Sequence, residues 1–350
     1  MLGTPWIALA LATSIALLTT RHRTAKRNRL LTEQERAMPP STLSRTAVVV
    51  GAAGGIGQAC AHRLAEAGFS VVAVGRDRPG RADRVVAGLS ARGSGPGQRH
   101  QFRACDAFSL GEVGRCAEGI VRDYDSVDAL VMSQGMAWVR GFTPTEEGND
   151  KKVTLHLWSR AAFAHGLLPS LRRSDATSMP GGPVVVSVLS GGVHSPYGGY
   201  DSDPELRESY SIKNAADMAG YYNDLFFDGL ARRPGNEGIS FVHAAPGFVN
   251  SNWGTEMPWF LRAAIRCLQP LGKSTDECAE LMVDPIIKAS AQGGSLGGLR
   301  PPSDDGMGVY IMNEDSTSGN LTMEHTQNVV QSVWKTTVDV LKRAGIHLES

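Results

Sequence analysis

A glycine-rich turn constrains the fold of this chain more than any other feature of the sequence. An apolar run, Thr46–Val50, is followed by Gly51-Ala-Ala-Gly-Gly-Ile-Gly57, and a helical pattern then continues to Gly68. Glycines at positions 51, 55 and 57 would let the backbone turn tightly and approach a pyrophosphate, and the next helix would offer its N-terminal amides to that anion. Because the turn joins an expected strand to an expected helix, it predicts a nucleotide-binding α/β domain.

Short apolar runs alternate with helical patterns along the rest of the chain. The expected strands are Thr46–Val50, Ser70–Val74, Gln101–Cys105, Ala129–Met132, Val184–Leu189, Ile239–Ala244 and Val309–Met312. Continuous apolar strands are typical of a sheet buried on both faces, so the alternation predicts a mostly parallel, doubly wound sheet in a three-layer fold. Residues 329–341 are expected to form an amphipathic helix on the core. One domain over residues 45–345 fits this pattern better than two.

Composition and charge exclude several classes of function. The 35 Lys and Arg residues balance the 35 Asp and Glu residues, so no net field would attract nucleic acid. The 5 cysteines are scattered and contain no CxxC pair. This usage indicates reduced thiols in a cytosol-like compartment, and neither a disulfide framework nor a zinc site is expected.

The N-terminus has the pattern of a membrane anchor. Residues 2–20 carry no charged side chain, and residues 21–29 are rich in Lys and Arg. A helix of about 19 residues rises roughly 28 Å, which is close to the hydrocarbon thickness of a bilayer. We therefore expect a single-pass anchor at residues 1–20, a basic linker at 21–44 and a cytosolic domain, on the endoplasmic reticulum or the outer mitochondrial membrane. A targeting peptide and a buried helix are the alternatives.

The end of the second expected strand bears on the choice of dinucleotide. A carboxylate at position 75 would accept a hydrogen bond from a ribose 2′-hydroxyl, but this position is Gly75. The neighbouring Arg76 would pair with a 2′-phosphate, which favours NADP over NAD. The alternative is that Arg76 is a solvated loop residue and that Asp77 reaches the ribose.

With these features in place, the chain resembles the short-chain dehydrogenase/reductase family over nearly all of its length after residue 45. The resemblance implies a Rossmann-like fold that binds NAD(P) and transfers a hydride. Its cofactor motifs match Gly51, Gly55, Ile56 and Gly57, Asp106 after the third strand, Gly135 after the fourth, and the segment Pro246, Gly247, Phe248, Val249, Asn250 and Ser251. By resemblance, Asp106 contacts adenine, whereas the backbone at Phe248 and Val249 and the hydroxyl of Ser251 hold the carboxamide.

The long segment between Ser190 and Tyr210, Gly148 ahead of the fourth helix and Trp334 near the C-terminus most resemble the membrane-associated, retinol-dehydrogenase-like branch. The chain also departs from the family's pattern at three points. The family's N-N-A-G segment is Met132-Ser133-Gln134-Gly135 here, so only the glycine is kept. The helix asparagine of the family's catalytic tetrad maps onto His156. The tetrad's lysine should follow its tyrosine by four positions, yet Lys213 follows Tyr210 by three, and the fourth position is Asn214.

Two hydroxyl groups are the main candidates for catalysis. Ser190 falls at the carboxyl end of the fifth strand, where ligands bind in open α/β sheets, and its hydroxyl would donate to a substrate carbonyl. Tyr210 would be the general acid, provided that a nearby cation lowers its pKa. A serine bonded to nearby backbone and a purely structural tyrosine are the alternatives. The shifted lysine then decides how well such a site would work.

In a helix that includes Tyr210, the third and fourth following positions lie on either side of its axial line. Lys213 would therefore remain near the phenol and reach the nicotinamide ribose, while Asn214 would bond a ribose hydroxyl without supplying charge. A solvated, idle Lys213 is the alternative. His156 would hold a relay water and titrate near neutral pH, or would be a packed helix residue. His194 is a lesser candidate for the rim of the cleft.

The segment after the sixth strand, residues 252–261, is unusually aromatic. It would line an apolar pocket or rest on a membrane surface, unless its tryptophans simply pack under a lid. Together with the expected membrane anchor, the aromatic segment favours a lipophilic carbonyl or alcohol as substrate.

A membrane-anchored NADP(H)-dependent oxidoreductase is thus the first hypothesis. A catalytically impaired NADPH-binding scaffold or sensor is the second, and a protein that binds no nucleotide the third. A homodimer is an open alternative to a monomer.

Overall fold

The computed structural model describes residues 45–93, 95, 97–137, 139–251, 259–291, 294–300, 303 and 306–348, which all belong to one compact unit. Its strands are β1 (Arg45–Val50), β2 (Phe69–Gly75), β3 (Gln101–Ala104), β4 (Ala129–Met132), β5 (Val184–Val188), β6 (Ser240–Ala244) and β7 (Val309–Met312). They form one sheet in the order β3-β2-β1-β4-β5-β6-β7, and every neighbouring pair is parallel. The predicted parallel α/β fold is confirmed, and each predicted strand is present to within one residue at either end.

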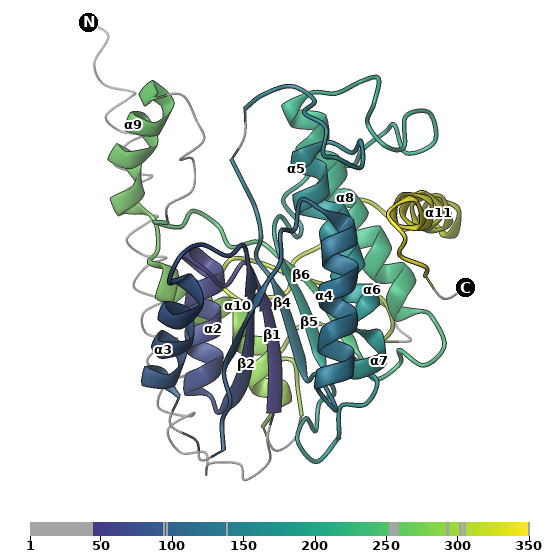
Figure 1. Cartoon of the computed structure of the whole chain (residues 1–350). Coiled ribbons are helices and arrows are strands. Elements are labelled where there is room, and N and C mark those ends of the chain that lie inside the picture. The colour runs from purple at the N-terminus through teal and green to yellow at the C-terminus, as the bar shows by residue number, and fades with distance from the viewer. Residues whose placement is uncertain are drawn as a thin grey trace, which may run out of the picture. The chain divides into compact units, whose positions relative to one another are not determined.

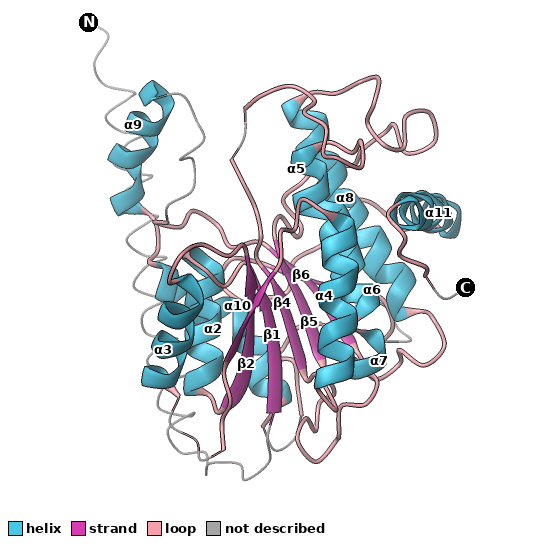
Figure 2. Ribbon diagram, in the orientation of Figure 1, coloured by secondary structure: helices cyan, strands magenta, loops and turns pink. Residues whose placement is uncertain are grey.

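Helices cover both faces of the sheet (Figures 1 and 2). One layer holds α2 (Gly55–Glu66), α3 (Arg81–Arg92) and α10 (Thr275–Ala289), and the other holds α4 (Leu110–Asp123), α6 (Ser159–Gly166), α7 (Leu168–Leu171), α8 (Ile212–Ala231) and α11 (Gln327–Arg343). The shorter elements are α5 (Lys151–Val153), the π-helix η1 (Thr154–Trp158), α9 (Trp259–Leu268) and the 3₁₀-helix η2 (Gln269–Leu271). The predicted C-terminal amphipathic helix is α11, whose buried side chains include Val329, Val333 and Leu341.

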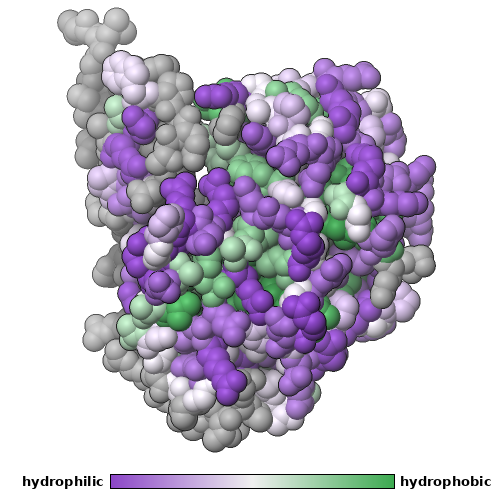
Figure 3. Space-filling view, viewed as in Figure 1, coloured by the Kyte–Doolittle hydropathy of each residue, from purple (hydrophilic) through white to green (hydrophobic). Residues whose placement is uncertain are grey.

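Successive side chains along a strand point to opposite faces of the sheet, so the core is divided between the two helical layers. On β1, Val48 and Val50 pack toward α4 and α8, whereas Ala47 and Val49 pack toward α2 and α10. All of these side chains are buried, as expected for strands that carry continuous apolar runs. Figure 3 shows hydrophilic residues over most of one face, with apolar residues in a band across its middle, where the sheet edge lies between the layers.

The order of the strands sets the place of a ligand site. The chain runs outward from β1 to β3 and then returns to place β4 on the other side of β1. In open parallel sheets a crevice forms at such a reversal, outside the carboxyl ends of the two strands. Here that crevice lies between the ends of β1 and β4, next to Gly51 and Ser133.

Among the described residues, no helix combines the length and apolar character needed to cross a bilayer. The expected anchor at residues 1–20 and the expected linker at 21–44 lie outside the described residues. Most of the aromatic segment, residues 252–258, also lies outside them.

Candidate functional site

The predicted glycine turn connects β1 to α2 as expected, and close packing explains two of its glycines. Gly51 has a φ of 88°, and a Cβ there would lie 2.9 Å from the amide nitrogen of Gln134. A Cβ on Gly57 would overlap Oγ of Ser133 and lie 2.5 Å from the carbonyl oxygen of Gly51. Only glycine lets α2 begin this close to the end of β4, so the backbone of the turn stays open to a ligand.

A cavity of about 220 Å³ runs over the carboxyl ends of β1, β2 and β4. Its lining includes Gly51, Gly54, Gly75, Arg76, Arg81, Asp106, Phe108, Ser133, Gln134 and Gly135. The structure thus brings together four predicted cofactor residues, Gly51, Arg76, Asp106 and Gly135, that are distant in sequence. Exposed backbone at the start of α2 and a polar lining fit a dinucleotide, whose pyrophosphate binds at helix N-termini.

Positive charge gathers at the end of β2. The Arg76 guanidinium lies 5.6 Å from the centroid of the Phe108 ring, and Nη1 of Arg81 donates to the carbonyl oxygen of Arg76 across 2.9 Å. Partial burial, followed by the charges of Arg78 and Arg76, lowers the pKa of Arg81. The carboxylate of Asp77 instead accepts a hydrogen bond from the amide of Arg78. Sequence reasoning found Arg76 and missed Arg81, which the repeated arginines of residues 76–84 could have suggested.

The segment after β6 lies against the glycine turn. Ser251 is near the start of α2, because a Cβ on Gly55 would lie 4.0 Å from its Cβ. Val249 is buried and pairs with Lys273 in an isolated parallel bridge. Gly247 has a φ of 69°, and any side chain there would overlap the carboxylate of Glu314. Ser251 therefore lies beside the glycine turn, whereas Ile56 packs against the core on the α2 side of the sheet. The contact of residues 246–251 with a carboxamide stays a prediction.

Ser190 lies two residues beyond β5, at the predicted end of the strand. Its amide donates to Nε2 of His243 across 3.1 Å. Its Oγ is buried and has no hydrogen-bond partner in the described part of the chain. Helix α8 passes close by, since a Cβ on Gly220 would lie 2.6 Å from this Oγ.

Tyr210 occupies a different environment from the predicted one. It precedes α8, which begins at Ile212 because Oγ of Ser211 caps the helix by accepting from the amide of Asn214. The expectation that Tyr210 and Lys213 share a helix face is therefore wrong. The phenol donates to Oδ1 of Asp150 across 3.3 Å, and it is not hydrogen-bonded to Ser190. Burial and the charge of Asp150 raise the pKa of Tyr210 to about 12, the opposite of the expected direction.

Lys213 and Asn214 interact with neighbours on their own segment. The Lys213 side chain is 75% exposed, and its Nζ pairs with Oδ2 of Asp217 one turn later in α8. This matches the alternative of a solvated lysine and not the expected contact with the phenol. Nδ2 of Asn214 donates to the carbonyl oxygen of Ser209 across 2.8 Å. Neither side chain faces the cavity described above.

His156 lies in the π-helix η1 and is buried. Its Nε2 accepts a hydrogen bond from the amide of Met136 across 3.0 Å, just beyond the end of β4. Burial, helped by the charges of Arg160 and Lys152, lowers the pKa of His156 to about 3. The expectation that this residue titrates near neutral pH is therefore wrong, and the imidazole stays uncharged. His194, expected at the cleft rim, is also buried.

Comparison with known proteins agrees with this architecture. The family model described as short chain dehydrogenase matches residues 45–193. The NmrA-like family domain-containing oxidoreductase notO of Aspergillus sp. is 26% identical over 311 residues, which cover 85% of this chain and 90% of that protein. Over residues 45–193, this chain is similar to the short-chain dehydrogenase/reductase family.

Further relatives of this chain come from fungi and mammals. Oxidoreductase andH of Emericella variicolor is 34% identical over 209 residues, which cover 59% of this chain and 58% of that protein. Polyprenol dehydrogenase of Mus musculus is 28% identical over 305 residues, covering 85% and 83%. Among solved structures, the Pseudomonas aeruginosa RhlG/NADP active-site complex is 26% identical, with a TM-score of 0.52 and coverage of 73% and 94%.

The structure also contains a buried cation, Arg160, that sequence reasoning missed. Nη1 of Arg160, on α6, donates to the carbonyl oxygens of Met132 and Val188 and to Oγ of Ser187, and its Nη2 donates to the carbonyl oxygen of Gln134. Burial lowers the pKa of Arg160 to about 9. The guanidinium ties the ends of β4 and β5 together beneath the crevice. Nothing in the sequence distinguishes it from a solvated helix arginine.

Proposed function

We propose that the chain is an NADP(H)-dependent oxidoreductase that interconverts a carbonyl and an alcohol on a lipophilic small molecule. The observation that carries the cofactor assignment is the pair Arg76 and Arg81 in the lining of the cavity at the end of β2. A carboxylate at this point would favour the free 2′-hydroxyl of NAD, whereas arginine favours a 2′-phosphate. The P. aeruginosa structure, by its description, is a complex with NADP, which supports the same choice.

In this proposal each part of the site has one role. NADPH, when bound, supplies the hydride. The start of α2 binds the pyrophosphate, Arg76 and Arg81 bind the 2′-phosphate, and Asp106 lies beside the adenine. Ser190 donates a hydrogen bond to the substrate oxygen, and Tyr210 delivers the proton to it. Because the phenol rests on Asp150, Tyr210 has to turn away from that carboxylate before it acts.

Three observations support a lipophilic substrate and a membrane location. One relative is a polyprenol dehydrogenase by name, and it matches 85% of this chain. Trp259, within the aromatic segment, and Phe248, shortly before it, are 74% and 40% exposed. The apolar residues 2–20 have the length of a membrane span. We propose a single-pass protein with its catalytic domain in the cytosol, acting on a small molecule and not on nucleic acid.

Cofactor preference is tested by binding NADPH and NADH to the full chain, purified in detergent. Arg81→Ala should weaken NADPH binding about tenfold, since a charge-assisted contact to phosphate is lost, and should leave NADH binding unchanged. Arg84→Ala is the matched control, because Arg84 lies on the same helix but does not line the cavity. Equal affinity of the unaltered protein for both dinucleotides would contradict the assignment to NADP.

Catalysis is tested by NADPH oxidation with a panel of lipid aldehydes and ketones. Tyr210→Phe removes the proposed proton donor and should reduce kcat by at least about a hundredfold, the usual scale of general acid catalysis. A variant with unchanged turnover would show that Tyr210 is not the acid.

A second function is favoured by the surroundings of Tyr210 and Lys213. The phenol donates to a carboxylate, and Lys213, three residues later, is paired with Asp217. These contacts suit an NADPH-binding scaffold or sensor that has lost catalysis. This candidate predicts NADPH binding without turnover on any substrate. If Asn214→Lys then produced turnover, the site would be a decayed form of the family's.

A further inference from the structure

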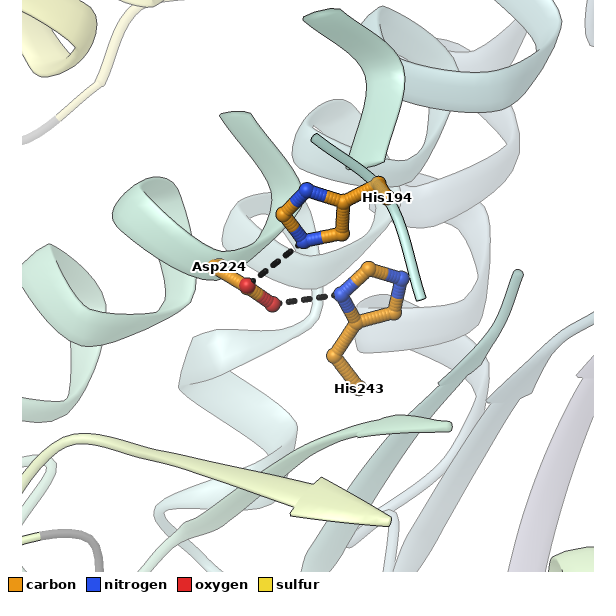
Figure 4. A group of neighbouring side chains, drawn as sticks. All are labelled: His194, Asp224 and His243. Atoms are coloured by element: carbon orange, nitrogen blue, oxygen red, sulfur yellow. Dashed lines mark hydrogen bonds and ion pairs between the residues drawn. The ribbon is translucent and has the colours of Figure 1, made fainter. Parts of the chain in front are cut away.

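A buried cluster of two histidines and one aspartate lies beside Ser190 (Figure 4). His194 comes from the loop after β5, Asp224 from α8 and His243 from β6. Oδ2 of Asp224 is 2.8 Å from Nε2 of His194, and its Oδ1 is 2.5 Å from Nδ1 of His243. The two rings stack with their centroids 5.9 Å apart. None of the three side chains is more than 1% exposed.

The hydrogen bonds fix the protonation of His243. Its Nε2 accepts from the amide of Ser190, so that nitrogen carries no hydrogen. Its Nδ1 therefore carries the hydrogen and donates it to Asp224. Burial opposes the ionised form of Asp224, but the two histidines outweigh it and hold the pKa at about 2. His243 is thus a neutral ring with its acceptor nitrogen turned to Ser190, as a neighbouring carboxylate commonly arranges.

His194 lies in the same loop as Ser190 and is also bound to the carboxylate of Asp224. Its Nε2 donates to Asp224, and its Nδ1 lies 3.2 Å from the carbonyl oxygen of Ser195. Both ring nitrogens face acceptors, which suits an imidazolium. Burial opposes that charge, but the hydrogen bond to Asp224 prevails and raises the pKa of His194. Close packing supports the arrangement, since a Cβ on Gly220 would lie 2.5 Å from Cγ of His194.

We propose that Asp224, His243 and His194 form a positioning triad that holds Ser190 in place for the reaction. The proposal rests on the proposed function in one respect only, which is that the hydroxyl of Ser190 binds the substrate. That hydroxyl has no partner in the described part of the chain, whereas its own amide is bound to His243. The triad thereby fixes the backbone of Ser190 while it leaves Oγ free to bond to a ligand.

His243 has to stay neutral for this role, because a proton on Nε2 would face the amide hydrogen of Ser190. The charged groups around it come from three elements. Asp224 on α8 favours protonation, and His194 in the loop and Arg160 on α6 oppose it.

Two histidines and a carboxylate are also common transition-metal ligands. Here, however, each ring nitrogen that faces Asp224 lies within direct hydrogen-bond distance of it, which is the arrangement of a shared proton.

The test compares two substitutions of Asp224 in the full-length protein. Asp224→Leu removes the carboxylate, so amide exchange in the peptide that contains Ser190 should accelerate at least about tenfold, and kcat should fall at least about tenfold with NADPH binding unchanged. Asp224→Asn keeps an acceptor for His243 and a donor for His194, so both quantities should stay close to those of the unaltered protein. Asp228→Leu, one turn later on α8, is the control, since Asp228 pairs with Arg232 and contacts neither His243 nor Ser190.

The exchange measurement does not depend on turnover. Unchanged exchange at Ser190 in Asp224→Leu would overturn the triad, whereas failure of the unaltered protein to oxidise NADPH would overturn only the proposed function. If Asp224→Leu does not fold, His243→Leu asks the same question from β6. Metal analysis of the purified protein is a further arm. One equivalent of a transition metal that disappears in His243→Leu would overturn the proposal and make the cluster a metal site.

Discussion

The phenol of Tyr210 donates to Oδ1 of Asp150 across 3.3 Å, so the proposed general acid rests on a helix cap. The same carboxylate accepts from the amides of Lys152 and Val153 at the start of α5. It is 3% exposed, so little solvent screens its charge from the phenol. The position of Tyr210 is therefore coupled to α5, which leads directly into η1 and His156.

Asp150→Asn should lower the pKa of Tyr210 from about 12 toward its ordinary value near 10, because a neutral amide no longer repels the tyrosinate. The fall should be partial, since burial also raises the pKa of Tyr210 and is unchanged. Titration of Cζ-labelled tyrosine by NMR, with Tyr210→Phe used to assign the signal, measures it. Asparagine caps helices as well as aspartate does, so the free energy of unfolding should change little.

Asp150→Ala serves as the comparison, because it removes the cap as well as the charge. It should cost about 1 kcal/mol of stability in urea unfolding. A pKa of Tyr210 that stays at about 12 in Asp150→Asn would mean that burial alone raises it.

Two glycines of the turn after β1 should respond differently to the same substitution. Gly57→Ala places a Cβ against Ser133 and the backbone of Gly51, so α2 would have to shift, at a cost of about 1–3 kcal/mol. Gly54→Ala should be tolerated without cofactor, because Gly54 has an extended φ of 175° and nothing lies within 4 Å of its Cβ position. Urea unfolding and NADPH binding of both variants measure the difference. Equal stability of the two variants would contradict the close approach of α2 to β4.

Local patterns predicted the parts of this molecule that depend on neighbours in sequence. The strands followed from continuous valine-rich runs, and the cofactor crevice followed from a turn whose glycines lie within seven residues of one another. The start of α8 carried a local signal as well, the cap at Ser211, but the resemblance placed Tyr210 inside the helix and hid it.

The rest of the site depends on pairings that no local pattern encodes. Asp150 meets Tyr210 from 60 residues away, and Arg160 reaches oxygens from 26 to 28 residues away. Asp224, His194 and His243 come from a helix, a loop and a strand. Each of these residues looks like a solvated polar side chain in the sequence. Only the stacking of α6 and α8 on the sheet removes them from water, and that burial shifts the pKa values of His156 and Tyr210 away from their ordinary range.

Arg160→Met should destabilise the fold by about 3 kcal/mol or more, because buried carbonyl oxygens at the ends of β4 and β5 lose their donor. Arg160→Lys keeps the charge but cannot reach all four acceptors at the ends of β4 and β5, so it should recover only part of that loss. The control is Arg122→Met, which removes an arginine that is 74% exposed and paired with Asp123, and it should cost less than about 1 kcal/mol. Urea unfolding measures all three. Stability of Arg160→Met equal to that of the unaltered protein would show that the guanidinium is dispensable.

The lowered pKa of His156 should make stability depend on pH below neutrality. The unfolded chain binds a proton at this ring near pH 6.5, whereas the folded protein resists protonation until about pH 3. The contribution of His156 to the free energy of unfolding is therefore fully present above pH 6.5. It falls as the pH drops, by up to about 1.4 kcal/mol per pH unit. His156→Asn should flatten that slope, since an amide oxygen can accept from Met136 without titrating. Urea unfolding between pH 4 and 7 tests this, with His347→Asn near the C-terminus as the control, and an equal slope in both variants would contradict the assignment.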